Sequence, residues 1–176
     1  MNIQATANDY GTISEGSTLT IQRWLPGPVE RIWTYLTDSD HRRRWLAAGE
    51  MRLAPAASFE FVWRNGELSD PSDPRPEGFP EEARMSSHVI AVDPMRMLRI
   101  AWGKGDVTFE LMPKGEKVLL TLTHRGLDDR GARTMIAAGW HMHLDILVAR
   151  VSGKESVSFW SGWAQLRDTY EQRLPQ

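Results

Sequence analysis

The sequence has 176 residues, of which 41% are hydrophobic and 25% charged, and its formal net charge is −2. This length and balance fit one globular domain, with or without an added segment, and exclude disordered and collagen-like chains. The absence of a basic excess predicts no nucleic-acid or polybasic membrane contact, and the absence of cysteine excludes disulfides, thiolate metal sites and cysteine nucleophiles.

The first part of the chain predicts an arm, a strand and a helix. Residues 1–16 are polar and predict a flexible N-terminal arm. They contain no signal-peptide stretch, and no run in the chain approaches the ~20 apolar residues that cross a bilayer, so we expect a cytoplasmic protein. Alternation over Thr18–Leu25 predicts a strand, which the Pro-Gly-Pro segment at 26–28 ends. Apolar residues at helical spacing then predict a helix from Val29 to about Thr37.

A second short helix is expected to follow, with Asp38 or Asp40 as its N-cap. It carries three consecutive arginines, Arg42 to Arg44. Because stacking aromatics are not interleaved with them, this run favours a solvated helix face over a nucleic-acid site. Trp45 is expected in the core or in the wall of a cavity.

From residue 50 the pattern changes to a period of two, which is typical of strands. Short turns separate most of the runs, as in an antiparallel meander. The proline-rich, acidic segment at 65–82 instead predicts a long flexible loop. The expected strands are Phe59–Trp63, Arg84–Val92, Met97–Trp102, Val107–Leu111 and Val118–His124.

Helical periodicity returns after Gly126. An apolar stripe predicts a helix of about six turns that starts at Asp128 or Asp129 and stops at Gly153. A last helix is expected at about Val157–Arg173. Its apolar side is expected to pack on its own domain, with a homodimer interface as the alternative.

Several segments of the sequence resemble one protein family. They are RWLPGPVERIWTYLTD (23–38), Trp45-Leu46, VIAVDPMRMLRIAW (89–102), VTFELMPKGEKVLLTLTHRGL (107–127) and AGWHMHLDILVARV (138–151). In this order they resemble the START-like superfamily, also called SRPBCC or helix-grip proteins, and within it the branch similar to activators of heat-shock protein 90 ATPase. Two features depart from that family: Pro55-Ala56-Ala57 stands where glycines are common, and the loop at 65–82 is longer.

The resemblance implies an α+β fold in which a curved antiparallel sheet wraps around a long C-terminal helix, with a deep cavity between them. Two short helices follow the first strand, and one extra helix ends the chain. We therefore expect a flexible arm at 1–16, a helix-grip domain at 17–153 and a C-terminal helical extension at 154–176. One fold hosts many functions, so the resemblance implies no single ligand or reaction.

Three histidines are predicted to point into the space between sheet and helix. Strand alternation places His88 with Ile90 and places His124 with Leu122, and helical spacing places His143 beside Leu147. Each histidine is read either as a single hydrogen-bonded residue or one at the cavity rim, or as an anchor for a ligand or part of a general acid–base pair. No metal-ligand spacing such as HExxH occurs, so no metal site is expected.

Large aromatic side chains also fall on the predicted inward faces. They are read either as simple core packing or as the apolar walls of a cavity. With the histidines and their apolar neighbours they form the candidate ligand-binding set: Phe59, Phe61, Trp63, His88, Ile90, Trp102, Phe109, Leu122, His124, Trp140, His143 and Leu147.

No carboxylate pair, nucleophile elbow or phosphate-binding glycine loop appears, and no cofactor is expected. No catalytic residue is therefore assigned, and an enzyme is disfavoured. The leading hypothesis is binding of a small hydrophobic or amphipathic ligand in the central cavity. The alternative is an interaction protein that acts as a co-chaperone on a chaperone ATPase. A third reading is an enzyme, such as a cyclase or hydrolase, that uses the cavity histidines.

Overall fold

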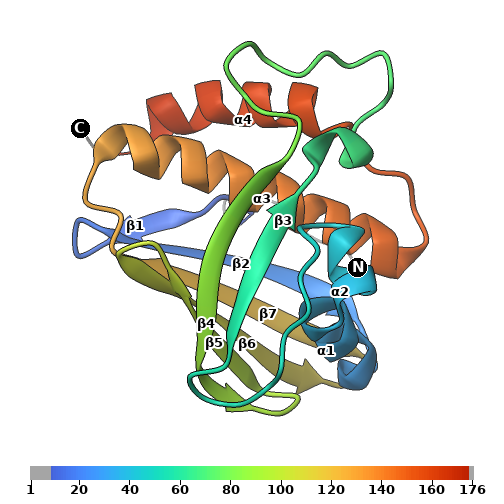
Figure 1. The fold of residues 1–176 in the computed structure, drawn as a ribbon. Helices are drawn as coiled ribbons and strands as arrows, with labels where there is room; N and C mark the ends of the chain where they lie inside the picture. Colours follow the sequence, from blue (N-terminus) through green and yellow to red (C-terminus); the bar gives the residue numbers. More distant parts are fainter. Residues whose placement is uncertain (1–8, 175–176) are drawn as a thin grey trace.

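Residues 9–174 are described by the computed structural model, in which seven antiparallel strands form a single curved sheet (Figure 1). The strand order is β1-β2-β7-β6-β5-β4-β3. The strands are β1 (Thr12–Ser14), β2 (Thr18–Pro26), β3 (Ser58–Trp63), β4 (Ala83–Asp93), β5 (Met97–Trp102), β6 (Gly105–Lys114) and β7 (Lys117–Arg125).

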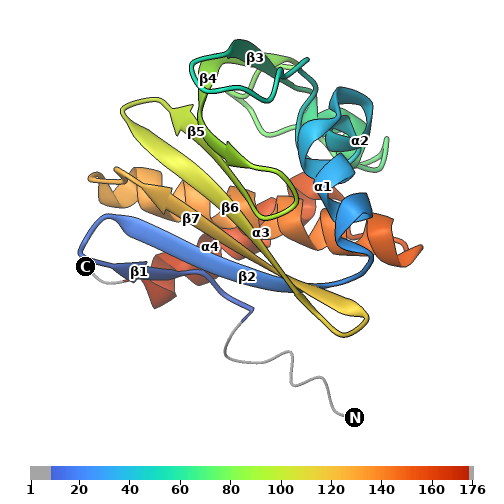
Figure 2. The same ribbon diagram turned by 90° about the horizontal axis from the view of Figure 1, so that it is seen from below.

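The helices are two short ones, a 3-10 turn and two long ones. They are α1 (Val29–Thr37), α2 (Ser39–Arg43), η1 (Asn65–Leu68), α3 (Arg130–Ser152) and α4 (Phe159–Arg173). The α3 helix covers one face of the sheet, and α4 lies on the side of α3 away from the sheet (Figure 1). Figure 2 shows α1 and α2 at one end of the sheet. This architecture confirms the predicted α+β helix-grip fold with one extra C-terminal helix.

The predicted helix ends are confirmed at the level of single atoms. The Asp38 carboxylate accepts a hydrogen bond from the His41 backbone N–H at 3.0 Å, and Asp129 accepts one from the Ala132 N–H at 2.8 Å. Gly153 ends α3 in the left-handed conformation, with φ 66°, which favours glycine. None of the helices formed by residues 9–174 is long and apolar enough to cross a membrane.

The β4 strand contains an irregularity that overturns one prediction. Val89 pairs with Ile100 and Val92 pairs with Leu98, so the register shifts between them. The bulge adds one residue to β4. Counting every second residue back from Val92 to find those that face the core therefore selects the wrong residues on the N-terminal side of the bulge. His88 is exposed rather than inward, and Ile90 lies within the bulge and is half-buried.

Part of the segment predicted as a flexible arm is a strand. Within residues 1–16, Thr12–Ser14 forms β1 and pairs antiparallel with β2 at the edge of the sheet. The Gly11 N–H donates to the Tyr170 hydroxyl at 2.7 Å, which ties this segment to α4. Residues 1–8 of the predicted arm lie outside the described residues.

Arg42 is buried, which contradicts the prediction that the three arginines form a solvated helix face. Its side chain is only 2% exposed, and its guanidinium donates to the carbonyls of Leu36, Thr37, Ala47 and Gly49. The burial lowers the pKa of Arg42 to about 10, so it still carries its charge at neutral pH. Its neighbours Arg43 and Arg44 are exposed.

The last helix packs on its own chain. Trp160, Trp163 and Tyr170 are each at most 5% exposed, and α4 lies along α3. Burial of these rings explains why so many large aromatics occur in a helix of 15 residues.

Candidate functional site

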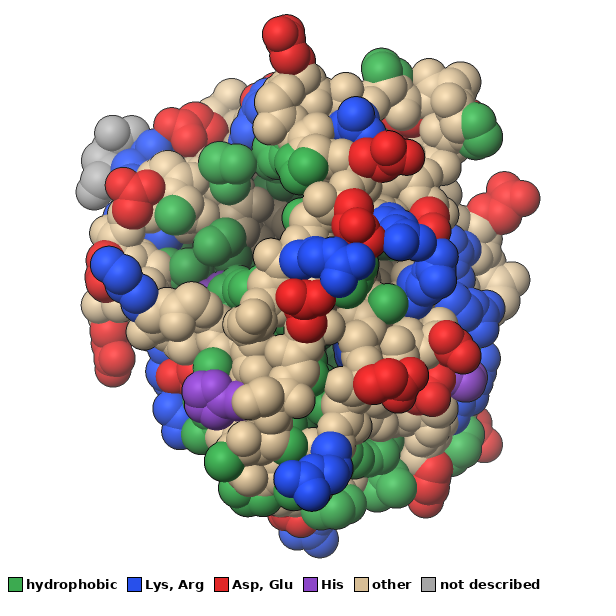
Figure 3. All heavy atoms as spheres, viewed as in Figure 1, with side chains coloured by type: hydrophobic (Ala, Val, Ile, Leu, Met, Phe, Trp, Pro, Cys, Tyr) green, Lys and Arg blue, Asp and Glu red, His purple; other side chains and the backbone are tan. Residues whose placement is uncertain are grey.

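A pocket of about 300 Å³ opens between the sheet, α3, α4 and the segment that connects β3 to β4. Figure 3 shows this face hollowed, with hydrophobic side chains around the opening. None of the residues that line the pocket carries a formal charge: Leu46, Trp63, Asn65, Phe79, Ala83, Trp102, Met135, Ile136, Gly139, Trp140, His143, Phe159, Trp160 and Trp163.

One side of the pocket, which we call the inner wall, consists of Trp63 from β3, Trp102 from β5 and Trp140 from α3. The ring centroids of Trp63 and Trp102 are 5.5 Å apart, and those of Trp102 and Trp140 are 5.0 Å apart. These spacings are typical of favourable tilted aromatic contacts. The inner wall is therefore a continuous aromatic surface that joins the sheet to α3.

The opposite side, which we call the outer wall, comes from the connecting segment and α4. Phe79 packs against Trp160 and Trp163, with ring centroids 5.5 and 5.2 Å apart. Phe159 contacts both Trp160 and the imidazole of His143. The two parts of this wall, Phe79 and the start of α4, lie about 80 residues apart in sequence, so the wall forms only when the connecting segment packs on α4.

Hydrogen bonds attach the connecting segment to the start of α4. The Asp73 carboxylate accepts from the Ser158 hydroxyl at 2.5 Å and from the Ser161 backbone N–H at 2.9 Å. The Asp70 N–H donates to the Ser158 hydroxyl at 2.8 Å, and the Trp160 N–H donates to the Ser69 hydroxyl at 3.2 Å. The side chain of the N-cap residue of α4, Ser158, makes no capping hydrogen bond, and the loop supplies the cap instead.

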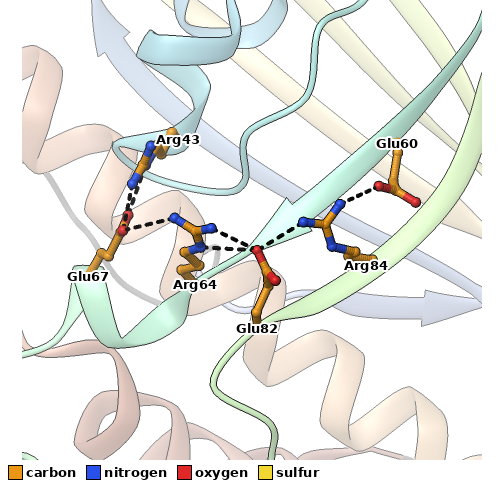
Figure 4. Close-up of polar contacts among 6 residues, drawn as sticks. All are labelled: Arg43, Glu60, Arg64, Glu67, Glu82 and Arg84. Carbon is orange, nitrogen blue, oxygen red and sulfur yellow. Dashed lines mark hydrogen bonds and ion pairs between the residues drawn. The ribbon is translucent and has the colours of Figure 1, made fainter.

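A chain of ion pairs runs across the outer surface beside the pocket (Figure 4). This arginine–glutamate ladder connects α2, η1, β3 and β4. Glu67 accepts from Arg43 at 2.6 Å, and Glu82 accepts from Arg64 at 2.9 Å. These hydrogen bonds lower the pKa of both carboxyl groups. The ladder comprises Arg43, Glu67, Arg64, Glu82, Arg84 and Glu60.

His143 is the one histidine that lines the pocket. Its Nδ1 lies 2.8 Å from the backbone carbonyl oxygen of Trp45, which can only accept, so Nδ1 carries the proton. The ring therefore leaves Nε2 as an acceptor. Burial lowers the pKa of His143 to about 4, and the ring is neutral at pH 7.

Two residues that line the pocket each have one polar side-chain atom that is buried without a partner. Within residues 9–174, neither Asn65 Oδ1 nor Trp160 Nε1 makes a hydrogen bond. The first atom is an acceptor and the second a donor. Buried polar atoms of this kind are uncommon in folded proteins, because each costs free energy when it loses its water partners.

The predicted site residues divide into three groups. Trp63, Trp102, Trp140 and His143 line the pocket. His88 and Ile90 do not, for the reason given by the β4 bulge. The remaining six are buried core residues that are not part of the lining: Phe59, Phe61, Phe109, Leu122, His124 and Leu147.

His124 lies behind the inner wall. Its Nδ1 accepts a hydrogen bond from the Trp140 indole N–H at 3.0 Å, so its own proton is on Nε2. Burial lowers the pKa of His124 to about 4. His124 and His143 therefore have different hydrogen-bond partners and are opposite tautomers. No hydrogen bond between them joins the two rings as an acid–base pair.

The sequence patterns missed the outer wall. Asn65 and Phe79 lie in the segment predicted as a loop, and Phe159, Trp160 and Trp163 lie in the predicted extension. One signal was available: Phe79 is the only aromatic in an otherwise polar, proline-rich loop. An apolar ring in such a segment indicates a contact with another part of the chain.

A second polar network, also missed, links α3, α4, β2 and the N-terminal segment. Asp145 accepts from Arg23 at 3.0 Å and lies 3.3 Å from His141 Nε2. Burial acts to raise the pKa of Asp145, but the hydrogen bond from His141 and the charge of Arg23 outweigh it, and the pKa is lowered. His141 Nδ1 in turn lies 2.8 Å from the Tyr170 hydroxyl.

Metal-ligating side chains do not gather in the described structure. Among residues 9–174, no group of three or more His, Asp or Glu side chains is placed as a metal ion requires. The chemistry that the pocket offers is apolar contact together with a few neutral hydrogen-bonding atoms.

Comparison with known proteins gives both a family and structural relatives. The model of the family described as Activator of Hsp90 ATPase homolog 1-like protein matches residues 26–152. The solution NMR structure of a Bordetella parapertussis protein, encoded by gene BPP1335, is 34% identical, with a TM-score of 0.78 over 100% of this chain and 97% of that chain. No curated protein matches the chain.

Two more distant structures share the fold alone. A conserved protein of unknown function from Enterococcus faecalis, EF2215, is 18% identical, with a TM-score of 0.72 over 97% of this chain and 92% of that one. CalU16 from Micromonospora echinospora is 19% identical, with a TM-score of 0.62 over 88% and 86% of the two chains.

Proposed function

This chain belongs to the Activator of Hsp90 ATPase homolog 1-like family, within the SRPBCC or START-like helix-grip proteins, and from that premise we propose that it binds a small, largely apolar molecule in its pocket. The proposal places the ligand between the inner and outer walls. The sequence predicts a central cavity between the sheet and the long helix, and the proposed site lies toward the β3–β5 end of that interface, beside α4.

The observation that carries the proposal is the lining of the pocket. Five of the eight tryptophans of the chain surround about 300 Å³ of space, and no charged side chain lines it. A volume of about 150 Å³ lined by apolar side chains is enough to hold benzene. The pocket therefore has room for a molecule of about two rings, and burial of its apolar surface supplies the binding free energy.

Gly139 offers a direct test, because it lines the pocket in the middle of α3. A Cβ atom built at this position meets no other atom within 4 Å. Gly139→Leu would place its side chain in the pocket and block a ligand. Gly139→Ala is the matched control, because it adds only one methyl group. Both variants should fold as stably as the wild type or better, since glycine costs about 0.5–1 kcal/mol inside a helix.

Native mass spectrometry of freshly purified protein, compared with the denatured mass, is the measurement. The proposal predicts a reproducible excess mass in the wild type and in Gly139→Ala, and its loss in Gly139→Leu. An excess that Gly139→Leu retains would place the ligand elsewhere. A bare mass for all three, together with no binding of added apolar probes, would contradict the proposal.

The family description supports a second candidate, namely stimulation of an Hsp90-type ATPase. A co-chaperone acts through its surface, so this activity should be the same in Gly139→Leu as in the wild type. An ATPase assay with purified chaperone and both proteins separates the two candidates. Stimulation without any bound ligand would favour the co-chaperone.

A further inference from the structure

The imidazole of His143 narrows the chemistry of the ligand, and this inference rests on the proposed binding function. We propose that the ligand is an uncharged, largely apolar ring molecule that carries an N–H or O–H group and donates a hydrogen bond from it to His143 Nε2. His143 lies on α3, one helical turn after Gly139, and both residues line the pocket.

The protein fixes the orientation of this imidazole. Its Nδ1 donates to the Trp45 carbonyl at 2.8 Å, and Trp45 is buried and does not line the pocket. The Trp45 indole N–H donates in turn to the Tyr35 carbonyl at 2.8 Å, which helps to hold Trp45 in place. The ring of Phe159 packs against the imidazole, with ring centroids 4.6 Å apart. Because the two nitrogens diverge across the five-membered ring, Nε2 points away from Trp45.

Nε2 can be reached from the pocket. Within residues 9–174 no group donates to it, and its contacts are those of Nδ1 and the ring face alone. It is not one of the unpartnered polar atoms that lack accessible surface, which are Asn65 Oδ1 and Trp160 Nε1. His143 is 6% exposed and lines the pocket. The exposed part of the side chain therefore includes Nε2, and the pocket is where a ligand meets it.

The partner that this nitrogen requires is a hydrogen-bond donor. With the proton on Nδ1, Nε2 can only accept. A purely apolar ligand that covered Nε2 would leave it unpaired, which costs binding free energy. A ligand with an N–H or O–H group at that place keeps the acceptor paired, and the surrounding aromatic rings make the hydrogen bond stronger than it is in water. The pocket should therefore prefer a ligand with a donor over an apolar molecule of the same shape.

The same surroundings disfavour a charged ligand. A carboxylate has no proton to donate and would place its charge against the Nε2 lone pair. An ammonium group can donate, but it would lose its hydration in a pocket whose lining carries no opposite charge. His143 itself adds no positive charge at pH 7, because burial lowers its pKa to about 4. The ligand class is therefore a neutral donor on an apolar ring system, such as an indole or a phenol.

Indole and benzofuran test the inference, because these two-ring probes share one shape and differ in an N–H group against an oxygen atom. Isothermal titration calorimetry at pH 7 measures both affinities. The wild type should bind indole about tenfold more tightly, which corresponds to the upper range of one neutral hydrogen bond. Two charged probes, aminoindane as a cation and indane carboxylate as an anion, should bind more weakly than indole. Equal affinities for indole and benzofuran, or tighter binding of either charged probe, would overturn the inference.

Variants assign the contact to His143. His143→Asn keeps an amide N–H that can reach the Trp45 carbonyl but has no atom at the position of Nε2, so the preference for indole over benzofuran should disappear. His143→Phe removes both nitrogens and should show the same loss. Ile136→Val is the matched control, two helical turns earlier in the lining: it removes one methyl group and should change both affinities by the same factor. A preference for indole that persists in both His143 variants would contradict the assignment.

Nitrogen NMR of the histidine rings gives a second measurement, which uses the wild type alone. The unprotonated Nε2 of His143 should shift upfield when indole binds, because it then accepts a hydrogen bond, and should shift much less when benzofuran binds. The ring nitrogens of His88, which is exposed, are the internal control and should not move with either probe. The same Nε2 shift with both probes would mean that indole donates no hydrogen bond to His143.

The outcomes distinguish this inference from the proposed function. If indole and benzofuran bind the wild type equally and neither binds Gly139→Leu, the pocket binds ligands but the role of His143 Nε2 is wrong. If no probe binds, the inference fails, and the native mass of the purified protein then decides the proposed function separately.

Discussion

Arg42 shows how one side chain can organise a stretch of chain that has little regular structure. Its guanidinium reaches four backbone carbonyls between the end of α1 and the start of β3. It also lies over the ring of Phe61, 5.3 Å from the centroid. The fixed fork of a guanidinium satisfies several acceptors at once, which an ammonium group cannot do with the same geometry.

Arg42→Ala should lower the free energy of unfolding by about 3 kcal/mol, because it leaves buried carbonyls without a donor. Urea denaturation at pH 7.5 measures the change. Arg43→Ala, at an exposed neighbour in the same helix, should have a much smaller effect. Equal losses for the two variants would mean that the Arg42 hydrogen bonds contribute little.

His143 should make the stability depend on pH. Its pKa is about 4 in the folded protein, against about 6.5 when unfolded, because burial disfavours the charged ring. Between these values the unfolded chain binds the proton and the folded chain does not. Stability is therefore lost as the pH falls from about 6.5 toward 4.

His143→Gln should reduce the loss of stability between pH 7.5 and 5.0 by about 2 kcal/mol. Glutamine has no titrating group there and can still donate toward the Trp45 carbonyl. Urea denaturation at the two pH values gives the loss for each protein. His88→Gln, at an exposed position, is the control. An unchanged loss in His143→Gln would mean that His143 is charged in the folded protein at pH 5.

At the scale of elements, α4 and the β3–β4 connection depend on each other. The loop carboxylate of Asp73 caps the first turn of α4, and α4 in turn provides the rings on which Phe79 packs. A negative charge at this helix end is also favourable for the helix dipole. Together these contacts build the outer wall of the pocket.

Asp73→Ala should destabilise this contact by about 1 kcal/mol, the usual value of a lost helix cap. Hydrogen–deuterium exchange should accelerate in residues 69–79 and in the first turn of α4, with little change in the sheet. Glu77→Ala, an exposed acidic residue of the same loop, should not alter the exchange. Protection that persists in Asp73→Ala would show that aromatic packing alone holds the loop.

At the scale of the whole molecule, Tyr170 joins parts that are distant in sequence. Its hydroxyl accepts from Gly11 and contacts His141, which continues through Asp145 to Arg23 on β2. Burial raises the pKa of Tyr170 to about 12, so the hydroxyl keeps its proton as a donor at neutral pH. The network therefore fastens the N-terminal segment and β2 to both α3 and α4.

Tyr170→Phe should lower the free energy of unfolding by about 1–3 kcal/mol, because the Gly11 N–H and His141 lose a buried partner. Limited proteolysis should then cut the segment around β1 faster than in the wild type. Tyr10→Phe keeps the ring that contacts His141 and Tyr170 and serves as the control. Wild-type stability in Tyr170→Phe would exclude this role of the network.

The sequence by itself determined most of the elements of this protein, their order and the caps of α2 and α3, but it missed β1 and η1. The strands from β5 to β7, the caps at Asp38 and Asp129, and the stop at Gly153 depend on residues close together in the chain. Alternation, helical spacing and capping are local properties, so they can be counted along the sequence. The resemblance to a family then supplied the way in which the sheet grips the helix.

Only the tertiary structure decided which side chains form the pocket. The bulge in β4 reverses the alternation that placed His88 inward, and one extra residue is enough to do so. Arg42 is buried because distant backbone carbonyls converge on it. The outer wall joins residues 65–79 to residues 159–163. These segments lie about half the chain apart, and no local sequence pattern encodes packing between such distant segments.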